Sequence, residues 1–420
     1  MKFALFTPNF PPERGACARR VAQLAESLHD AGHEVIVFTP FIEGSTSNYN
    51  FSVHQLSVSY FKTPSLWKRL WSATRISFGF LQLGKEIEAF KPNFIWVQAP
   101  PWPLPVVGWW LSKKYQAKFI LNLSDLHPSA LLDLGKLKDN WFYRFLQRIE
   151  RYFYRRADII FGQSEEILTY VRDHTAEKSL VKTPTTATAH PFPGSPTTGR
   201  DFYLNNSFLY RNGIRPTHFS KKSTPSKHFR WVYIGSLGEA QDIRTFLEKI
   251  DFKELQQEFH LFGTGQQEKS IRVIANQSDW VTLHPPIPPE EVAETLVQFD
   301  AALIVQKQHI FGTVPSKIYE AMNAGLPILL LGAGESAKII QESESGDSVT
   351  PQNWAAIRQT MQEFPKRKDL EQLGKNGQQF AHKYFSHEVQ FQRFLQAVLA
   401  QQNEEKREDE KERQDIEKTK

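Results

Sequence analysis

The sequence is almost free of sulfur-containing side chains. It holds one cysteine and three methionines among 420 residues. Because a disulfide needs two cysteines, no intrachain disulfide can form, and such a chain is typical of a reducing compartment. We therefore predict a cytoplasmic protein in which Cys17 is a small helical residue rather than a nucleophile.

Long hydrophobic runs are also missing. The longest apolar run, Trp102 to Leu111, contains two prolines and is well short of the roughly twenty residues that span a membrane. The first residues, MKFALFTPNFPP, are too short and too rich in proline for a secretory signal, so they predict a strand. The sequence thus predicts neither a membrane-spanning helix nor an export signal.

Neither sign of charge is in large excess, since the formal net charge is only +5. Residues 404–420 contain eight acidic and six basic residues and almost no apolar ones, so we predict that the tail 403–420 is disordered or a frayed helix. The arginines elsewhere are not interleaved with a base-reading motif. Nucleic acid is therefore not an expected partner.

Strand and helix signals alternate along most of the chain. Apolar runs that predict strands occur at residues 3–7, 34–38, 94–98, 119–123, 159–161, 231–235, 259–262, 280–283, 301–305 and 328–331. Strands separated by amphipathic helices are typical of parallel sheets covered on both faces. We predict an α/β protein with two Rossmann-like, doubly wound domains and a cleft between them, where open α/β sheets bind ligands.

The alternation is interrupted between residues 183 and 229. Thr, Pro, Ser, Asn and basic residues dominate this stretch, so we interpret it as a linker or irregular insertion. The predicted domains are then residues 1–182 and 230–385, followed by an amphipathic helix over residues 386–402.

The most informative segment is VPSKIYEAMNAGLPILLL, residues 314–331. Ser316 stands where a helix N-cap is expected, Gly325 supplies a left-handed stop, and an apolar run then predicts a buried strand. Free N–H groups at a helix start attract anions, and Lys317 adds a full positive charge. Glu320, one turn later, can accept both hydroxyls of a ribose. Phosphate and sugar together indicate a nucleotide site.

Two glycine turns add to this site. Gly235 and Ser236 begin a turn between a strand and a helix, whose backbone can hold a diphosphate. Gly263 and Gly265 follow the next strand, where a nucleotide can approach the backbone; a plain tight turn is the equal alternative.

These residues resemble the donor-nucleotide motif of family 4 retaining glycosyltransferases, which have the GT-B fold. The resemblance is closest to the branch that builds O-antigen, capsule and exopolysaccharide. It implies that Glu320 holds the ribose and that Glu335 faces the site, and that helix 386–402 returns to the first domain. The sugar-facing Glu of many members is Gly312 here, and their phosphate-binding Arg and Lys are Ser236 and Gln241. Lys317 is therefore expected to carry most of the phosphate binding.

The resemblance also selects residues in the first domain. Arg14 and Gly15 lie in the loop after the first strand and are expected to contact donor phosphate or acceptor. Asp125 and His127, in the segment LSDLHP, match a motif at the end of another strand and are the predicted catalytic residues. For His127, a hydrogen-bonded core histidine is the alternative.

Two segments combine aromatic and basic residues, at residues 66–83 and 141–156. This composition suits the surface of an anionic bilayer, although a helix packed on a sheet with a solvated arginine face looks the same. We predict peripheral contact with the inner membrane face through these segments.

The resemblance implies transfer of a sugar, with retention, from a nucleotide-sugar that is UDP-linked to a glycan or lipid-linked acceptor in polysaccharide biosynthesis. It implies no metal or other cofactor. Two alternatives stay open: a non-catalytic nucleotide-sugar-binding scaffold or sensor, which the neutral Ser236 and Gln241 would suit, and a nucleotide-sugar epimerase.

Overall fold

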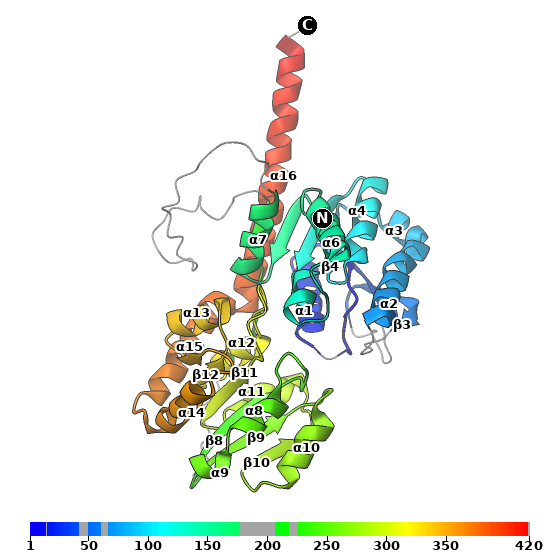
Figure 1. Cartoon of the computed structure of the whole chain (residues 1–420). Helices are drawn as coiled ribbons and strands as arrows, with labels where there is room; N and C mark the ends of the chain where they lie inside the picture. The colour runs from blue at the N-terminus through cyan, green and yellow to red at the C-terminus, as the bar shows by residue number, and fades with distance from the viewer. Residues whose placement is uncertain (14, 42–48, 60–65, 176–205, 218–225, 419–420) are drawn as a thin grey trace. The chain divides into compact units, whose positions relative to one another are not determined.

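Two parallel β-sheets, each covered by helices, form the framework of the protein (Figure 1). The structure, a computed structural model, describes residues 1–13, 15–41, 49–59, 66–175, 206–217 and 226–418. The chain divides into unit 1, Met1–Asn212 with Glu388–Lys420, and unit 2, Gly213–His387. The predicted α/β class with two Rossmann-like sheets is confirmed.

The sheet of unit 1 has the strand order β3-β2-β1-β4-β5-β6-β7, and all its strand pairs are parallel. The order reverses between β1 and β4, so the chain leaves these two neighbouring strands in opposite directions across the sheet. The strands are β1 (Lys2–Phe6), β2 (Glu34–Phe41), β3 (Ser52–Ser59), β4 (Phe94–Ala99), β5 (Lys118–Leu123), β6 (Ile159–Gly162) and β7 (Ser207–Leu209).

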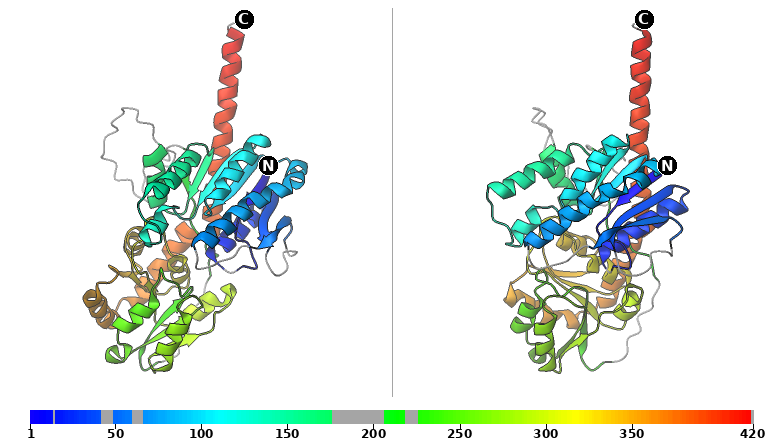
Figure 2. Two further views of the ribbon diagram at one scale, coloured as in Figure 1. Left: turned by 45° about the vertical axis from the view of Figure 1, so that its right-hand side comes forward. Right: turned by 90° about the vertical axis from the view of Figure 1, so that its right-hand side faces the viewer.

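Alternation along these strands divides the core of unit 1 into two layers, because successive side chains point to opposite faces. Ala4 and Phe6 of β1 belong to one buried cluster, whereas Phe3 and Leu5 belong to the other. The first cluster packs under α2 (Leu66–Gly79), η1 (Phe80–Leu83), α3 (Gly84–Phe90), α4 (Pro103–Lys114), α6 (Trp141–Tyr154) and α7 (Glu165–Thr175). The second packs under α1 (Ala16–Asp30) and α16 (His387–Lys418), as the views in Figures 1 and 2 show.

The sheet of unit 2 has the order β10-β9-β8-β11-β12-β13 and is also parallel. Its strands are β8 (Phe229–Ile234), β9 (Gln257–Phe262), β10 (Val281–His284), β11 (Ala301–Val305), β12 (Ile328–Leu331) and β13 (Gly346–Val349). Its helices are α8 (Ile243–Lys249), α9 (Phe252–Leu255), α10 (Glu268–Asn276), η2 (Pro289–Glu291), α11 (Val292–Leu296), α12 (Ser316–Asn323), α13 (Glu335–Glu342), α14 (Trp354–Glu363), η3 (Phe364–Lys366) and α15 (Leu370–Phe385). The order reverses between β8 and β11, which places a ligand-binding edge at the carboxyl end of β8.

The structure refines the sequence interpretation at two places. Residues 207–209, inside the expected insertion, form β7 and pair with β6 at the edge of the first sheet. The strand has only three residues, too short for a period-2 pattern to be recognised. The helix expected over residues 386–402 continues as α16 to Lys418, so of the two states expected for the tail the structure has the helical one.

No helix among the described residues is both long and apolar enough to cross a membrane.

Candidate active site

Lys317 reaches from α12 to the glycine turn at the carboxyl end of β8. A Cβ placed on Gly235 would lie only 2.3 Å from the Lys317 Cε atom, and Gly235 has a φ of +146°. The Lys317 Nζ atom also lies 5.1 Å from the centre of the Tyr233 ring, within range of a cation–π interaction. The absence of a side chain at Gly235 therefore leaves the room that the lysine occupies.

Burial of the Lys317 side chain is unfavourable for its charged ammonium form. Burial lowers the pKa of Lys317 below its usual value, and the nearby Glu320 carboxylate raises it in part. Both side chains lie with Tyr233 around a small cavity at β8 and β11. A positive charge that has lost much of its hydration gains strongly from an anion, because the anion replaces the missing solvation.

The start of α12 is close to the prediction but shifted by one residue. Pro315, with φ −62° and ψ 128°, is the N-cap, and Ser316 is the first helical residue rather than the cap. The fixed φ of proline suits the end of an extended segment just as well as a capping side chain would. Pro315 has no side chain that can cap the helix. The N–H groups of Ser316 and Lys317 therefore contribute to the positive helix end.

Gly263 and Gly265 have a packing role that the sequence interpretation left open. A Cβ on Gly263 would stand 1.9 Å from the Gly235 carbonyl oxygen, and one on Gly265 would stand 2.5 Å from that of Leu237. Backbone bonds join the same two turns, from Gly235 N to the Phe262 oxygen at 2.8 Å and from Leu237 N to the Thr264 oxygen at 3.0 Å. The two glycines therefore fix the shape of the β8–α8 turn.

Three other predicted positions in unit 2 have definite environments. Ser236 uses its backbone oxygen to accept a hydrogen bond of 2.6 Å from the Tyr233 hydroxyl, which holds the turn. Gly312 is buried with φ +84°, where a glutamate would be strained. Glu335 is the first residue of α13, and its side chain is buried, with 6% exposed.

In unit 1 the predicted residues Gly15, Asp125 and His127 line one pocket, which we call the unit 1 pocket. It has a volume of about 460 Å³ and lies at the carboxyl ends of β1, β4 and β5, beside the point where the strand order reverses. Arg14, predicted with Gly15, lies outside the described residues. The structure thus gathers three predicted residues at the edge where open α/β sheets bind ligands.

A buried polar network under the Asp125 loop was not found by sequence reasoning. Ser124 Oγ accepts hydrogen bonds from Arg20 and from Gln98 Nε2, and the Ser124 carbonyl accepts one from Gln163. Asn122 Nδ2 extends the network to Gln98 Oε1 at 3.0 Å. These residues come from α1, β4, β5 and the end of β6, so only the folded sheet brings them together.

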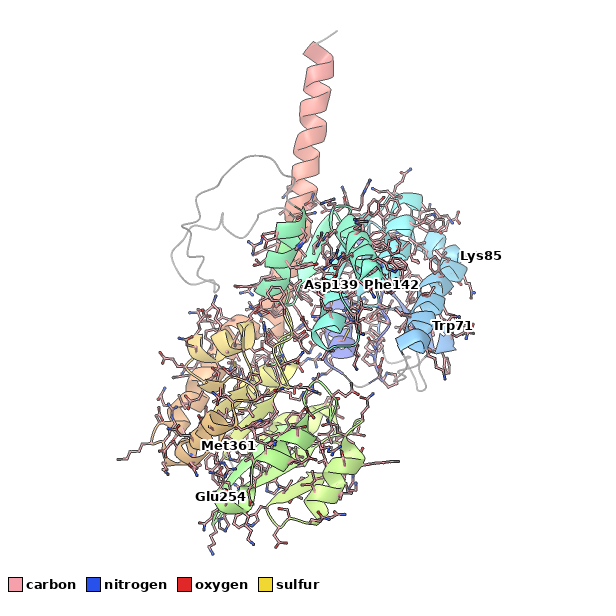
Figure 3. The ribbon with its side chains drawn as sticks, in the orientation of Figure 1. Trp71, Lys85, Asp139, Phe142, Glu254 and Met361 are labelled. Carbon is pink, nitrogen blue, oxygen red and sulfur yellow. The ribbon has the colours of Figure 1, made fainter. Side chains whose placement is uncertain are left out.

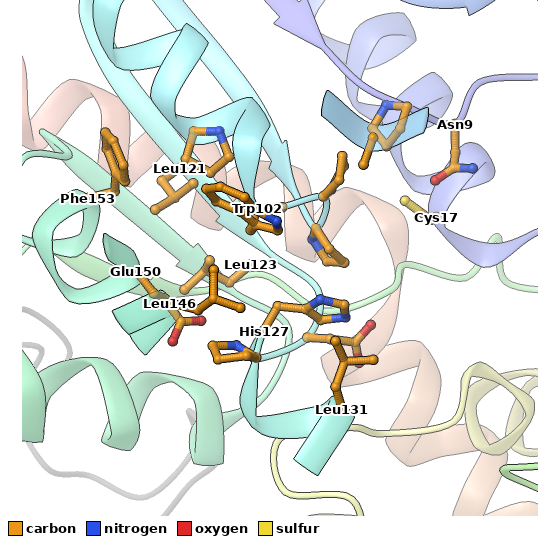
Figure 4. Close-up of a pocket in the computed structure, with 18 of the residues that line it drawn as sticks. Asn9, Cys17, Trp102, Leu121, Leu123, His127, Leu131, Leu146, Glu150 and Phe153 are labelled. Atoms are coloured by element: carbon orange, nitrogen blue, oxygen red, sulfur yellow. The ribbon is translucent and has the colours of Figure 1, made fainter. Parts of the chain in front are cut away.

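Glu150 is the second residue that the sequence did not reveal. It lies on α6 among Leu146, Phe153 and other apolar side chains of the unit 1 pocket (Figure 4). Burial raises the pKa of Glu150 to about 8, although the Tyr154 hydroxyl, the Arg151 charge and a hydrogen bond from the His127 backbone all lower it. Desolvation outweighs these three effects, so the carboxyl group is mostly neutral at pH 7. The only sequence signal is an acid within an otherwise basic aromatic helix.

Metal ligands are a separate question. Among the described residues, no group of three or more His, Cys, Asp or Glu side chains is placed to hold a metal ion.

Two family models match the chain. The model described as "Glycosyl transferase 4-like domain" matches residues 15–182, and the one described as "Glycosyl transferases group 1" matches residues 228–365. The chain belongs to the family 4 glycosyltransferases. In this GT-B glycosyltransferase the first model falls on unit 1 and the second falls on unit 2. A comparison with curated proteins gives no match.

Solved structures confirm the GT-B fold of this glycosyltransferase. Sucrose-phosphate synthase from Thermosynechococcus elongatus aligns with a TM-score of 0.72 and 16% identity, over 95% of this chain and 98% of that one. Anabaena HepE in complex with UDP-glucose gives 0.66 and 13%, over 95% and 100%. WaaG, a glycosyltransferase involved in lipopolysaccharide biosynthesis, gives 0.63 and 13%, over 92% and 97%.

Proposed function

We propose that this glycosyltransferase moves a sugar from a UDP-sugar to a glycan or lipid-linked acceptor, with retention at the anomeric carbon. The observation that carries the proposal is the position of the Lys317 ammonium, against the Gly235 turn and at the start of α12. The structurally similar HepE binds UDP and UDP-glucose, which supports uridine as the nucleotide. The similar WaaG and WaaB act in lipopolysaccharide synthesis, which supports a polysaccharide pathway.

The unit 2 residues divide the work of binding the donor. Lys317 and the free N–H groups of α12 stabilise the negative charge that grows on the diphosphate as the glycosidic bond breaks. Glu320 accepts hydrogen bonds from the two ribose hydroxyls. Because Ser236 and Gln241 are neutral, no second cation of that turn shares the phosphate charge. The leaving diphosphate takes the acceptor proton, so the reaction needs no protein base and, we propose, no metal.

The first test is binding of UDP to the purified protein. We expect UDP to raise the melting temperature more than ADP, GDP or CDP, because binding to the native state stabilises it by mass action. Lys317→Met should weaken the binding of UDP at least tenfold, which corresponds to about 1.4 kcal/mol. Lys338→Met is the matched control, because Lys338 is on α13, is 46% exposed and pairs with Glu342. Equal UDP affinity for Lys317→Met and the parent would exclude this phosphate site.

A second measurement separates the reaction from its alternatives. Release of UDP from one member of a UDP-sugar panel, only when membrane extract is added, indicates transfer to an acceptor. A sensor would bind UDP without releasing it from any sugar, and an epimerase would change the sugar without an acceptor. The same assay with and without EDTA tests the metal-independent mechanism; loss of activity that Mg²⁺ restores would contradict it.

A further inference from the structure

The unit 1 pocket is of ligand-binding size, and the unit 2 residues proposed to bind the donor are not among its lining residues. Its volume of about 460 Å³ lies in the range of pockets that bury small organic ligands. It extends from Asp125 and His127 at the strand ends to the inner sides of α2, α4 and α6. Figure 4 shows Glu150, Leu146 and Phe153 toward one side of the view and Asn9 and Cys17 toward the other, with Trp102 and His127 between.

The walls of the pocket are mostly hydrocarbon. Nine of the aliphatic, proline and aromatic side chains that form them are Leu70, Ala73, Pro105, Leu121, Leu123, Leu131, Leu146, Ile149 and Phe153. Such a surface gains roughly 25 cal/mol for each Å² of apolar area that a ligand covers. The occupant that suits it has a substantial apolar part.

The charges around the pocket select against an anion. The described lining residues include Glu13, Asp125 and Glu150 but neither lysine nor arginine. A phosphate or carboxylate placed beside these described residues would lose its hydration without gaining a cation from them. The described lining therefore favours an uncharged ligand over an anion.

Two buried polar groups in the pocket can take an uncharged partner. Trp102 Nε1 has no hydrogen-bond partner among the described residues, whereas the Glu150 carboxyl group contacts the Tyr154 hydroxyl and the His127 backbone. Buried polar groups are normally paired, so each exception calls for an explanation. The indole N–H donates, and the largely protonated Glu150 can donate as well. A hydroxyl, ester or amide oxygen would satisfy them.

The outer sides of the same helices suggest where such a ligand comes from. Trp71 on α2, Trp110 on α4 and Tyr152 on α6 are 63%, 47% and 41% exposed. Each lies beside a cation: Arg75 is 5.3 Å from the Trp71 ring, Lys114 is 5.3 Å from Trp110, and Arg156 is 5.0 Å from Tyr152. Helices that present such a surface to a bilayer and enclose an apolar pocket on their inner side suit a lipid as occupant.

We propose that the unit 1 pocket binds the hydrocarbon part of an uncharged, lipid-like acceptor, with an oxygen of that acceptor hydrogen-bonded to Glu150 and Trp102. The hydroxyl that receives the sugar then lies toward Asp125 and His127, at the strand ends. This rests on the proposed transferase function and adds the acceptor class to it. If the natural acceptor carries a phosphate, that phosphate lies outside the pocket.

The test uses the full-length protein and a probe of defined chemistry. The probe is 1-monolauroylglycerol with a dibrominated chain, whose bromine atoms quench tryptophan fluorescence at short range. We expect saturable quenching by this probe, a smaller quenching amplitude in Trp102→Phe, and at least tenfold weaker binding of brominated laurate at pH 7. Laurate binding as tight as the monoacylglycerol would overturn the assignment of an uncharged ligand.

A matched pair of variants locates the probe. Ala73 is 4% exposed and lines the pocket, so the larger side chain of Ala73→Phe should fill the pocket and weaken binding of the probe at least tenfold. Val273→Phe adds a ring at a 57% exposed site in unit 2 and should leave binding unchanged. Unchanged probe affinity in Ala73→Phe would place the probe on the outer surface and overturn the proposal.

The two proposals fail separately because UDP binding is measured on the same proteins. Normal UDP stabilisation of Ala73→Phe, together with a circular dichroism spectrum like that of the parent, shows that both units of the variant are folded, so its loss of probe binding belongs to the pocket. UDP binding without probe binding in the parent overturns the acceptor proposal alone. Probe binding without UDP binding leaves the pocket assigned and overturns the donor site.

A pH series tests the part played by Glu150. The groups that face it are Arg151 and Tyr154 on α6, Tyr170 on α7 and the His127 backbone. Burial also raises the pKa of both tyrosines, so they stay neutral over this range. Probe binding should weaken about tenfold at pH 9, where a group of pKa about 8 is mostly ionised. Glu150→Gln should bind equally at both pH values; a parallel decline in both proteins would exclude Glu150 as the hydrogen-bonding group.

Discussion

Individual glycines decide the shape of the donor-side turn. Gly235 leaves space for Lys317, and Gly263 lets two backbone turns come into contact. Neither needs to touch a ligand to matter. In a motif of this kind, a glycine marks the place where another part of the protein must pass close to the backbone.

Gly263→Ala should therefore destabilise the protein by more than about 2 kcal/mol, because its Cβ would overlap the Gly235 oxygen and φ is +155°. Gly84→Ala is the matched control, since Gly84 has φ −60° and its added Cβ would meet only the Tyr115 hydroxyl at 3.6 Å. It should be neutral or slightly stabilising. Urea unfolding measures both, and equal midpoints would contradict the packing role of Gly263.

Glu150 should make the stability of the protein depend on pH. Burial raises the pKa of Glu150 from 4.5 to about 8, so between these values the native state holds a proton that the unfolded state has lost. The contribution of Glu150 to stability should be fully present below pH 4.5 and fall as pH rises to 8, by at most about 4 kcal/mol from pH 5 to 8.

The control for this effect is Glu150→Gln, which cannot ionise. The stability difference between Glu150→Gln and the parent, from urea unfolding at pH 5, 6.5 and 8, should grow in favour of the variant as pH rises. A constant difference would show that Glu150 is ionised in the native protein throughout this range.

Among the elements, helices α2, α4 and α6 line the unit 1 pocket on one side and expose aromatic residues on the other. Trp71 lies at the surface of unit 1 on α2 (Figure 3), and the rings of Trp109 on α4 and Tyr152 on α6 contact each other with centroids 5.9 Å apart. Aromatic rings beside cations are the usual composition of a membrane-surface site. We therefore propose that this outer aromatic surface, with Trp71, Trp110 and Tyr152, contacts an anionic bilayer.

The double variant Arg75→Glu and Lys114→Glu should weaken sedimentation with anionic vesicles by roughly thirtyfold or more, since each basic residue near the surface contributes about 1 kcal/mol. Lys269→Glu with Lys338→Glu changes the charge equally on exposed lysines of unit 2 and should have little effect. If both double variants bind vesicles like the parent, this surface is not a membrane contact.

The element scale also shows what sequence patterns could and could not give. The strand β12 and the left-handed Gly325 after α12 follow the prediction, because apolar runs and glycine stops are local signals. The edge strand β7 was missed because three residues carry no period. On α6 the buried positions are Tyr143, Leu146, Phe153 and Tyr154, because tertiary packing sets the rotation of the helix.

At the scale of the molecule, the chain enters unit 2 after Asn212 and returns to unit 1 through α16. Phe394 of α16 is fully buried and stacks on Phe161 with ring centroids 4.8 Å apart. The last helix is therefore part of the core of unit 1, although the whole of unit 2, Gly213–His387, separates it in sequence from the rest of unit 1.

Phe394→Ala should cost about 3 to 5 kcal/mol, as expected for a large core side chain. Truncation after residue 403 should change stability by less than about 0.5 kcal/mol, because the removed sequence has almost no apolar residue to bury. Urea unfolding of both variants checks this. A large loss on truncation would show that the charged end of α16 packs against the protein.

Local patterns in the sequence were enough to predict the class of sheet, the strand and helix around Lys317, and the resemblance to a nucleotide-sugar transferase. These follow from local periodicity and from short motifs whose residues are neighbours in the chain. The packing of Lys317 against Gly235, the burial that raises the pKa of Glu150, and the support of the Asp125 loop by Arg20 and Gln163 came from the fold alone. Burial and close approach depend on residues far apart in sequence, and these physical quantities set pKa values and pocket chemistry.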